Sequence, residues 1–161
     1  TLEHKQYIII NKLAYHTGSP GRGDVVVFRP PNDPKRPYVK RVIGVPGDRI
    51  VIEDGIISIE PKGSDTLSVI DESYLNSKNE GRTFQAPPSS GNRDRISYQV
   101  PEGRYFLLGD NRQGSVDSRS FRNGSGEAIP YVLEDSILGR VWLIALPISK
   151  IQSLEVPVYD L

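Results

Sequence analysis

The sequence predicts an all-β fold, and three observations support that prediction. Short runs rich in β-branched and aromatic residues alternate with Gly, Pro, Asn and Asp, a pattern typical of strands separated by turns. No window carries the periodicity of an amphipathic helix over several turns. Two strong turn signals, Gly-Val-Pro-Gly-Asp at 44–48 and Asp-Gly at 54–55, each stand between predicted strands.

The predicted strands are short runs that combine Val, Ile, Tyr and Phe with polar neighbours. The last run is the longest, and it contains Trp142, which we expect in the core rather than at a membrane interface. Residues 131–136 are the best candidate for a helix, of about one turn. In chain order the predicted strands comprise residues 7–10, 24–29, 38–43, 49–52, 56–59, 104–108 and 137–146.

The chain changes character between the turn at 54–55 and the strand at 104–108. Residues 60–100 are polar and rich in turn residues, and Pro-Pro-Ser-Ser-Gly at 87–91 is the loosest stretch. Such a segment is typical of an insertion that forms an extended ribbon and a mobile loop. We therefore predict a β core from residues 1–54 and 102–150, an inserted β-ribbon subdomain of residues 55–101, and a C-terminal tail of residues 151–161.

Composition limits the classes of function. The 161 residues suffice for one domain, and 20 basic residues balance 20 acidic ones, so the charge gives no reason to expect a nucleic-acid partner. No apolar run approaches the ~20 residues of a membrane-spanning helix. The absence of cysteine excludes disulfides and a cysteine nucleophile, and neither His4 nor His16 has partners at zinc-ligand spacing, so we expect no metal. The absence of methionine implies residues upstream of Thr1, either the initiator alone or a longer segment.

Lys40 is the first candidate for a chemical role. In a strand over 38–43 it shares one face with Tyr38 and Val42, so its amine could be partly buried. Burial disfavours the ammonium ion and lowers the pKa, which turns a lysine into a general base near neutral pH. The alternative is a lysine on a solvated strand face, and for this segment alone that alternative is the more common outcome.

The loop 109–119 is the second candidate. Gly-Asp-Asn-Arg-Gln-Gly-Ser-Val-Asp-Ser-Arg follows an apolar strand directly, and a dense polar cluster at a strand exit is a usual place for a functional site. One alternative is a structural loop held by Asp/Arg pairs and Asx turns. A calcium loop is disfavoured, because Arg112 occupies a position where an oxygen ligand is needed.

Taken together, the chain resembles type I signal peptidases, bacterial or organellar, over about residues 1–146. Thr1-Leu2 resembles the end of that family's Ser-Met-x-Pro-Thr-Leu box, and Gly-Asp-Val-Val-Val-Phe at 23–28 is similar to its second box. Tyr-Val-Lys-Arg-Val-Ile-Gly-Val-Pro-Gly-Asp at 38–48 resembles the lysine box. The loop 109–119 resembles the terminal Gly-Asp-Asn-Arg box. The last two boxes together are highly specific, and they favour the functional interpretation of Lys40.

The resemblance implies a role for several residues. Lys40 would be the general base of a Ser/Lys dyad, Ser115 would orient its amine by a hydrogen bond, and Asp117 would support the site by pairing with Arg119. Arg41 and Asp110 match a second pair, which we interpret as structural. The same resemblance implies no metal and no cofactor. The residues implied to line the pockets for small substrate side chains are Leu2, Tyr38 and Val39.

The family's nucleophilic serine stands in the part of its first box that precedes the Thr-Leu match, so we expect it upstream of Thr1. The oxyanion-hole donors and the membrane-spanning anchor of the family are expected upstream as well. The chain alone is therefore expected to cleave nothing. The resemblance implies a membrane-anchored protein whose catalytic domain lies on the extracytoplasmic side, at the periplasm, cell surface or thylakoid lumen, and whose partners are the signal peptides of exported preproteins.

Two alternatives stay open at this point. One is another Ser/Lys peptidase, such as a self-cleaving repressor of the LexA type, although the terminal box and the insertion argue against it. The other is a non-catalytic paralogue that binds peptides or assembles with a partner. The gene sequence upstream of Thr1 distinguishes the enzyme from the binding module, because only the enzyme needs Ser-Met-x-Pro there.

Overall fold

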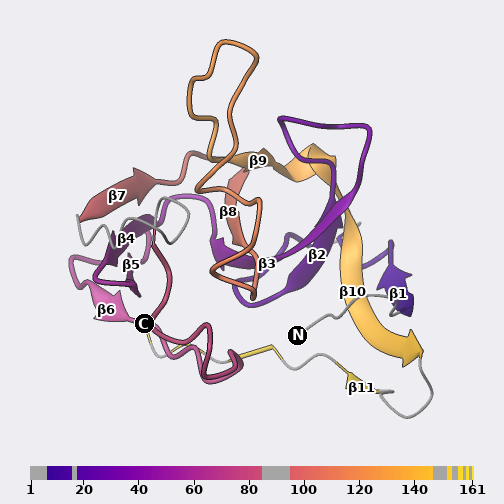
Figure 1. The fold of residues 1–161 in the computed structure, drawn as a ribbon, viewed down its shortest axis with the longest axis horizontal. Coiled ribbons are helices and arrows are strands. Elements are labelled where there is room, and N and C mark those ends of the chain that lie inside the picture. Colours follow the sequence, from indigo (N-terminus) through magenta and orange to yellow (C-terminus); the bar gives the residue numbers. More distant parts are fainter. Residues whose placement is uncertain are drawn as a thin grey trace.

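A computed structural model of the chain describes residues 7–15, 18–84, 95–146, 152–153, 156–157, 159 and 161. The regular secondary structure of the described part is almost entirely β-strand, and the strands form two antiparallel sheets (Figure 1). Its helical content is one 3-10 turn, Glu134–Ser136, inside the segment 131–136 that was the best helix candidate. The predicted all-β fold is confirmed.

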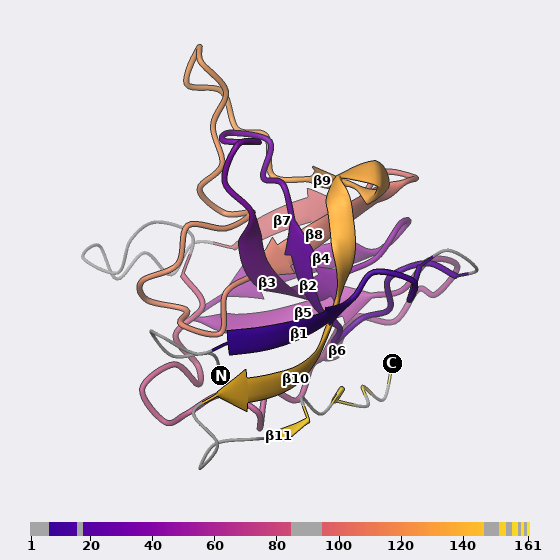
Figure 2. The ribbon, with the colours of Figure 1, turned by 90° about the vertical axis from the view of Figure 1, so that its right-hand side faces the viewer.

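The first sheet has the strand order β1-β10-β2-β3-β8-β9, and β11 pairs with the far end of β10. β10 is long enough to pair with β1, β2 and β11 along its length, and it bends strongly as it does so (Figure 2). The strands of this sheet are β1 (Tyr7–Asn11), β2 (Val25–Phe28), β3 (Tyr38–Gly44), β8 (Arg104–Leu108), β9 (Val132–Leu133), β10 (Ile137–Leu146) and β11 (Gln152–Ser153).

The second sheet has the order β6-β5-β4-β7, with strands β4 (Arg49–Glu53), β5 (Ile56–Glu60), β6 (Ser68–Val69) and β7 (Ile96–Gln99). β4 and β5 form a hairpin across the turn at 54–55, where both residues have positive φ, 52° at Asp54 and 82° at Gly55. This is the backbone conformation that an Asp-Gly pair favours in a two-residue hairpin loop.

One hydrophobic cluster joins the two sheets. Ile43, Phe106 and Leu108 of the first sheet pack together with the buried side chains of the second sheet, and each of these three is 0% exposed. Burial of apolar surface between two sheets is the main stabilising term of such a layered fold. The members contributed by β4, β5 and β7 are Ile50, Ile52, Ile57, Ile59 and Tyr98.

The predicted strands all form, within a residue or two at their ends. The sequence patterns missed four strands, β6, β7, β9 and β11, of which three are only two residues long. The division at residues 54 and 102 into a core and an insertion stays a prediction. Hydrogen bonding alone places β4, which precedes that boundary, in one sheet with β5 and β7. The loop expected at 87–91 lies outside the described residues.

The expectation that Trp142 belongs to the core is wrong, because its side chain is 65% exposed. Side chains of a strand point alternately to opposite faces. Val141, its neighbour on β10, packs inward and is 2% exposed, so Trp142 must point outward. In the part of the chain described here, no helix has the length and apolar character needed to cross a membrane.

Candidate active site

The candidate site lies at the N-terminal part of β3, where this strand pairs with β2 on one edge but does not pair with β8 on the other. β3 pairs with β2 from Tyr38 to Arg41, but with β8 only from Arg41 onward. The other edge of β3 at 38–40 is therefore unpaired among the described residues, and it borders a pocket of about 400 Å³. The opposite wall of that pocket is the loop after β8, which contributes Gly109, Asp110, Asn111, Gly114, Ser115 and Val116.

Lys40 lines this pocket from β3, opposite Val26 of β2. Its side chain is half-buried, and its Nζ lies 5.6 Å from the centre of the Tyr38 ring. Burial lowers the pKa of the Lys40 amine below its ordinary value, with a smaller contribution in the same direction from Arg119, while Asp117 and Asp110 oppose the shift. The amine is thus easier to deprotonate than that of an exposed lysine.

Ser115 reaches the same pocket from the loop after β8. Its Oγ is buried and has no hydrogen-bond partner among the described residues, so the hydrogen bond to Lys40 that the resemblance implied is not formed here. A buried hydroxyl without a hydrogen-bond partner is unusual in a folded protein. Ser115 packs directly on Gly109, since a Cβ on Gly109 would stand 2.0 Å from Ser115 Oγ and 3.5 Å from Lys40 Cδ.

Asp117 lies behind the pocket wall and is completely buried. Arg119 donates to it twice, from Nε to Oδ1 at 2.9 Å and from Nη2 to Oδ2 at 2.8 Å. The backbone N–H of Gly109 also donates to Asp117 Oδ2, at 3.1 Å. A buried carboxylate needs such partners, because an unpaired buried charge is strongly destabilising.

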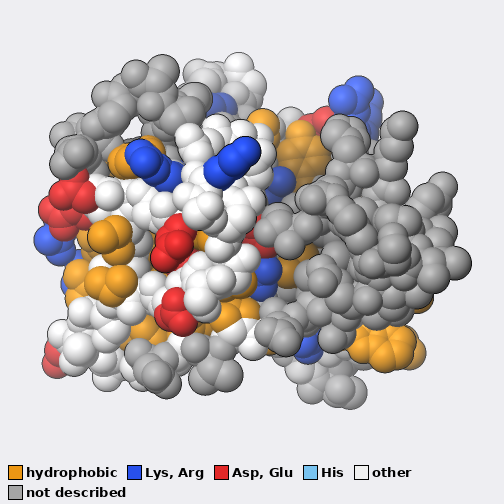
Figure 3. Space-filling view, turned by 60° about the horizontal axis from the view of Figure 1, so that its bottom comes forward, with side chains coloured by type: hydrophobic (Ala, Val, Ile, Leu, Met, Phe, Trp, Pro, Cys, Tyr) orange, Lys and Arg blue, Asp and Glu red, His pale blue; other side chains and the backbone are white. Residues whose placement is uncertain are grey.

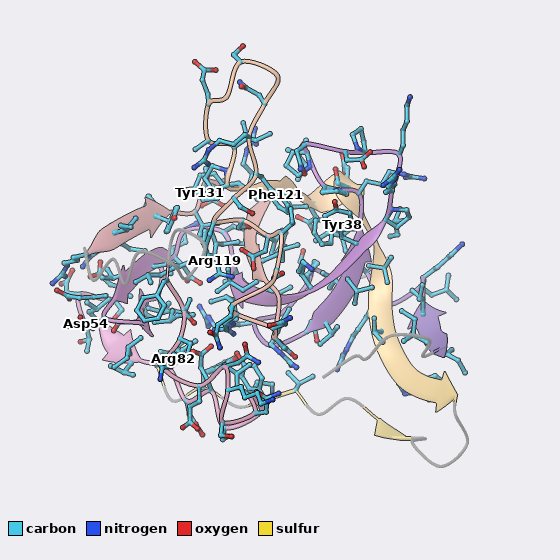
Figure 4. The ribbon with its side chains drawn as sticks, in the orientation of Figure 1. Tyr38, Asp54, Arg82, Arg119, Phe121 and Tyr131 are labelled. Carbon is cyan, nitrogen blue, oxygen red and sulfur yellow. The ribbon has the colours of Figure 1, made fainter. Side chains whose placement is uncertain are left out.

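Arg119 links the loop to the rest of the interior, and its side chain is drawn in Figure 4. Beyond Asp117, it donates to the carbonyls of Phe84 and Arg112 at 2.8 Å and 2.9 Å. Ser118 anchors the loop to β8, accepting at Oγ from Leu107 N and donating its own N–H to Leu107 O, at 2.9 Å and 3.1 Å. The loop is therefore a rigid platform for Ser115.

Arg41, the neighbour of Lys40 on β3, points away from the amine and forms a bidentate pair with Asp110 at 3.0 Å and 2.8 Å. Its guanidinium stacks 4.1 Å from the centre of the Tyr74 ring and donates to Gly23 O. The side chains of this pair are 4% and 9% exposed. The pair ties β3 to the start of the loop 109–119, which fixes the two walls of the pocket against each other.

The structure brings together four of the six residues predicted for the site. Lys40, Ser115, Tyr38 and Val39 line one pocket, and Asp117 supports it from behind without lining it. Leu2 lies outside the described residues, as do His4 and His16. The described residues contain no cluster of three or more side chains suited to hold a metal ion.

Sequence patterns did not single out Gly109, Val25 or Val116 as parts of the site. Gly109 stands where only a residue without a side chain lets Ser115 and Lys40 approach, and its place at the exit of β8 was the available signal. Val25 and Val116 add apolar surface to the pocket, and Val116 is 49% exposed. A strand edge, an apolar pocket and an amine of lowered pKa form a site that can bind an extended peptide and accept a proton beside it.

Comparisons with known proteins agree on one family. A protein-family model described as "Signal peptidase, peptidase S26" matches residues 1–146. Proteins named "Signal peptidase I" from Rickettsia typhi and Rickettsia conorii are each 46% identical over 137 residues, which is 74% of this chain and 52% of each relative. The chain thus spans about half the length of the curated relatives it matches. The crystal structure of a signal peptidase I from Enterococcus faecalis V583 superposes with a TM-score of 0.54 at 28% identity, covering 75% of this chain and 95% of that one.

Proposed function

The chain belongs to the signal peptidase family, peptidase S26, and from that membership we propose that it is the catalytic part of a membrane-anchored serine endopeptidase. The enzyme would remove signal peptides from exported preproteins on the extracytoplasmic side of the membrane. The observation that carries this proposal is the Lys40 amine, whose pKa is lowered in a pocket that also contains the unpartnered Ser115 Oγ.

In the proposed reaction the nucleophile is a serine upstream of Thr1. Neutral Lys40 takes the proton from that serine hydroxyl while its oxygen attacks the scissile carbonyl carbon. The Lys40 ammonium then gives the proton to the departing amine of the mature protein, and the peptide C–N bond breaks to leave an acyl-enzyme. Water, deprotonated by the same amine, hydrolyses this ester and restores the serine.

The pocket supports this assignment in two further ways. An extended substrate can pair with the edge of β3 at 38–40, to which no described strand is paired, and side chains beside the scissile bond would then contact Val25, Val39 and Val116. Such a wall of branched apolar residues suits small side chains. Ser115 Oγ would donate to the neutral amine or accept from the ammonium once the upstream serine and the substrate occupy the pocket.

The decisive experiment uses the longer gene product, including the residues upstream of Thr1, on a synthetic leader peptide. Lys40→Ala should abolish cleavage, and Lys40→Arg should fail as well, because a guanidinium keeps its proton near neutral pH. Ser115→Ala should reduce the rate less, since it removes one orienting hydrogen bond worth ~1 kcal/mol or somewhat more in a buried site. Each variant is compared with the wild type by kcat/KM.

Lys62→Ala is the matched control, because Lys62 forms an exposed ion pair with Glu102 and should be dispensable. Full cleavage by Lys40→Ala would contradict the dyad. A gene without a serine at the expected place upstream would instead favour the peptide-binding alternative.

A further inference from the structure

Arg112 joins the segment between β6 and β7 to the loop that carries Ser115. Its Nη1 donates to Glu72 Oε1 at 2.5 Å and to Thr83 Oγ1 at 2.8 Å, and its Nη2 donates to the Tyr74 hydroxyl at 3.0 Å. Its Nε reaches the other way and donates to the carbonyl of Gly109 at 3.1 Å. One guanidinium therefore spans the distance between the second-sheet region and the pocket wall.

This link is buried, and each of the three guanidinium nitrogens of Arg112 donates at least one hydrogen bond. The Arg112 side chain is 0% exposed and that of Glu72 is 9% exposed, while the Tyr74 hydroxyl also donates to Glu72 Oε1 at 3.0 Å. Charge-assisted hydrogen bonds in a dry environment are strong and directional, and the planar guanidinium fixes the angles between its partners. Glu72 is the charged one of the three side chains that hold the guanidinium in place, and Thr83 and Tyr74 are the other two.

The other end of the link is Gly109, which has no room for a side chain. Gly109 packs so closely on Ser115 that an added Cβ would lie 2.0 Å from Ser115 Oγ, and the same Cβ would touch Lys40 Cδ at 3.5 Å. A small displacement of the Gly109 backbone must move Ser115 or open the pocket around Lys40. The bond from Arg112 Nε to Gly109 O opposes that displacement.

We propose that Glu72 and Arg112 are positioning residues of the active site, which hold Gly109 and thereby set the place of Ser115 Oγ beside the Lys40 amine. Neither residue contacts the pocket interior. The inference rests on the proposed function of Lys40 as a base, but its structural step can be tested without any peptidase activity. The competing explanation is a purely structural ion pair that stabilises the fold and leaves the pocket unchanged.

The test removes the link without changing the net charge. In the double variant Glu72→Gln/Arg112→Met no donor remains for the Gly109 carbonyl, and no buried charge is left unpaired. The charged groups that act on Lys40, namely Asp117, Asp110 and Arg119, stay in place. A loosened loop should admit water to the pocket, which weakens the burial that lowers the Lys40 pKa.

The readout is the rate at which an amine-specific acylating reagent modifies Lys40 as a function of pH, followed by mass spectrometry. We expect the apparent pKa of Lys40 to rise by about half a unit in the double variant. In the longer gene product, kcat should fall about tenfold while KM changes less than about twofold, because the substrate-binding strand edge is untouched.

A second double variant, Arg22→Met/Asp48→Asn, controls for lost stability. Arg22 pairs with buried Asp48 at 2.5 Å and also donates to a backbone carbonyl, that of Ile43, but it has no bond to Gly109. This variant should melt at a lower temperature and keep the Lys40 profile of the wild type. An unchanged Lys40 profile in both double variants would overturn the proposal and leave Glu72–Arg112 a structural pair.

Two arrangements keep the test decisive. If the double variant does not fold, Tyr74→Phe takes its place, because it removes only the hydroxyl that orients Arg112 and Glu72. A smaller rise of the Lys40 pKa is expected in this variant. The absence of any rise would again contradict the proposal. If the longer gene product cleaves no leader peptide, the proposed function fails, while the labelling of Lys40 in the present chain still decides whether Glu72 and Arg112 position the pocket.

Discussion

In the proposed role of a general base, Lys40 must satisfy two opposing requirements at one side chain. A base that works near neutral pH needs a lowered pKa, and here burial supplies the shift. The same burial destabilises the folded protein whenever the amine carries a charge, because the ammonium ion loses hydration that it keeps in the unfolded chain. The proposed activity and the stability of the fold are therefore in conflict at this position.

Lys40→Met should stabilise the protein in a pH-dependent way. Because the folded-state pKa of Lys40 is lowered, the unfolded chain binds more protons between that pKa and the ordinary value of 10.5, and the stability of the wild type rises with pH in that window. The gain from Met should therefore be largest at about pH 6 and should shrink toward about pH 10. Urea unfolding of the wild type and the variant at several pH values measures the difference between their free energies of unfolding. The contributions of the other titrating groups are common to both proteins and cancel in this difference. A gain that stays constant or grows with pH would contradict the burial of Lys40.

At the residue scale, physical patterns alone found the candidates but could not rank them. The alternation of β3 placed Lys40 on the face of Tyr38, yet the same pattern fits a solvated lysine; only the resemblance in the lysine and terminal boxes favoured a base. Gly109 stood in the candidate loop, but its packing role could not be predicted, because it comes from an approach of Ser115 that depends on tertiary packing. The same holds for Glu72, whose partner Arg112 lies 40 residues away in the chain.

The hairpin β4–β5 is the element whose local sequence specifies it most strongly. Asp54 and Gly55 both adopt positive φ, as a tight hairpin turn requires. The turn also packs under the segment that supplies Thr83, since Thr83 N donates to Gly55 O at 3.0 Å. Figure 4 labels Asp54 of the turn and Arg82 of the segment that contacts the turn.

Gly55→Ala should destabilise the protein by roughly 2–3 kcal/mol, through backbone strain and steric overlap together. Its φ of +82° disfavours a side chain, and the new Cβ would stand 2.3 Å from the carbonyl oxygen of Gly81. Gly63→Ala separates the two effects, because Gly63 has φ +80° but open space around it, so only the strain of about 1 kcal/mol should remain. Thermal unfolding of both variants gives the comparison. Equal losses would show that the turn does not press on residue 81.

At the element scale, the strands of four or more residues with β-branched runs could be predicted, with the exception of β7. Ile-Ser-Tyr-Gln of β7 has few apolar residues, and it becomes a strand because β4 offers its free edge. The strands β6, β9 and β11 comprise two residues each, and two residues are too few to show an alternating strand pattern. Their formation depends on the neighbouring strand, which is a property of the tertiary fold.

At the scale of the whole molecule, the balance of charge is visible on the surface. Figure 3 shows acidic, basic and hydrophobic side chains intermingled over the described part of one face, in keeping with a net charge of zero. Such a surface creates no long-range field of one sign. Under the proposed function, recognition of a signal peptide would then depend on the local pocket and on the strand edge of β3 rather than on electrostatic steering.

The two sheets share one hydrophobic cluster and therefore pack against each other. Composition marked residues 60–100 as different, but it could not indicate that β4 turns its apolar face toward β3 and β8. That contact is encoded by residues distant in the chain, such as Ile50 and Phe106, which meet in one cluster. The same packing brings Glu72 close to the loop 109–119, where it pairs with Arg112.

A shared cluster predicts that both sheets unfold together. Ile59 of β5 is 0% exposed within that cluster, so Ile59→Ala should cost about 2–5 kcal/mol. Trp142, the single tryptophan, reports on the first sheet through its fluorescence, and circular dichroism reports on both sheets. Both signals should shift to the same lower midpoint.

Ile56→Ala on the same strand, where the side chain is 46% exposed, should cost less than about 1 kcal/mol. If Ile59→Ala left the midpoint of the Trp142 fluorescence transition unchanged, the two sheets would unfold independently. A link from Glu72 to the pocket could then not transmit strain between them.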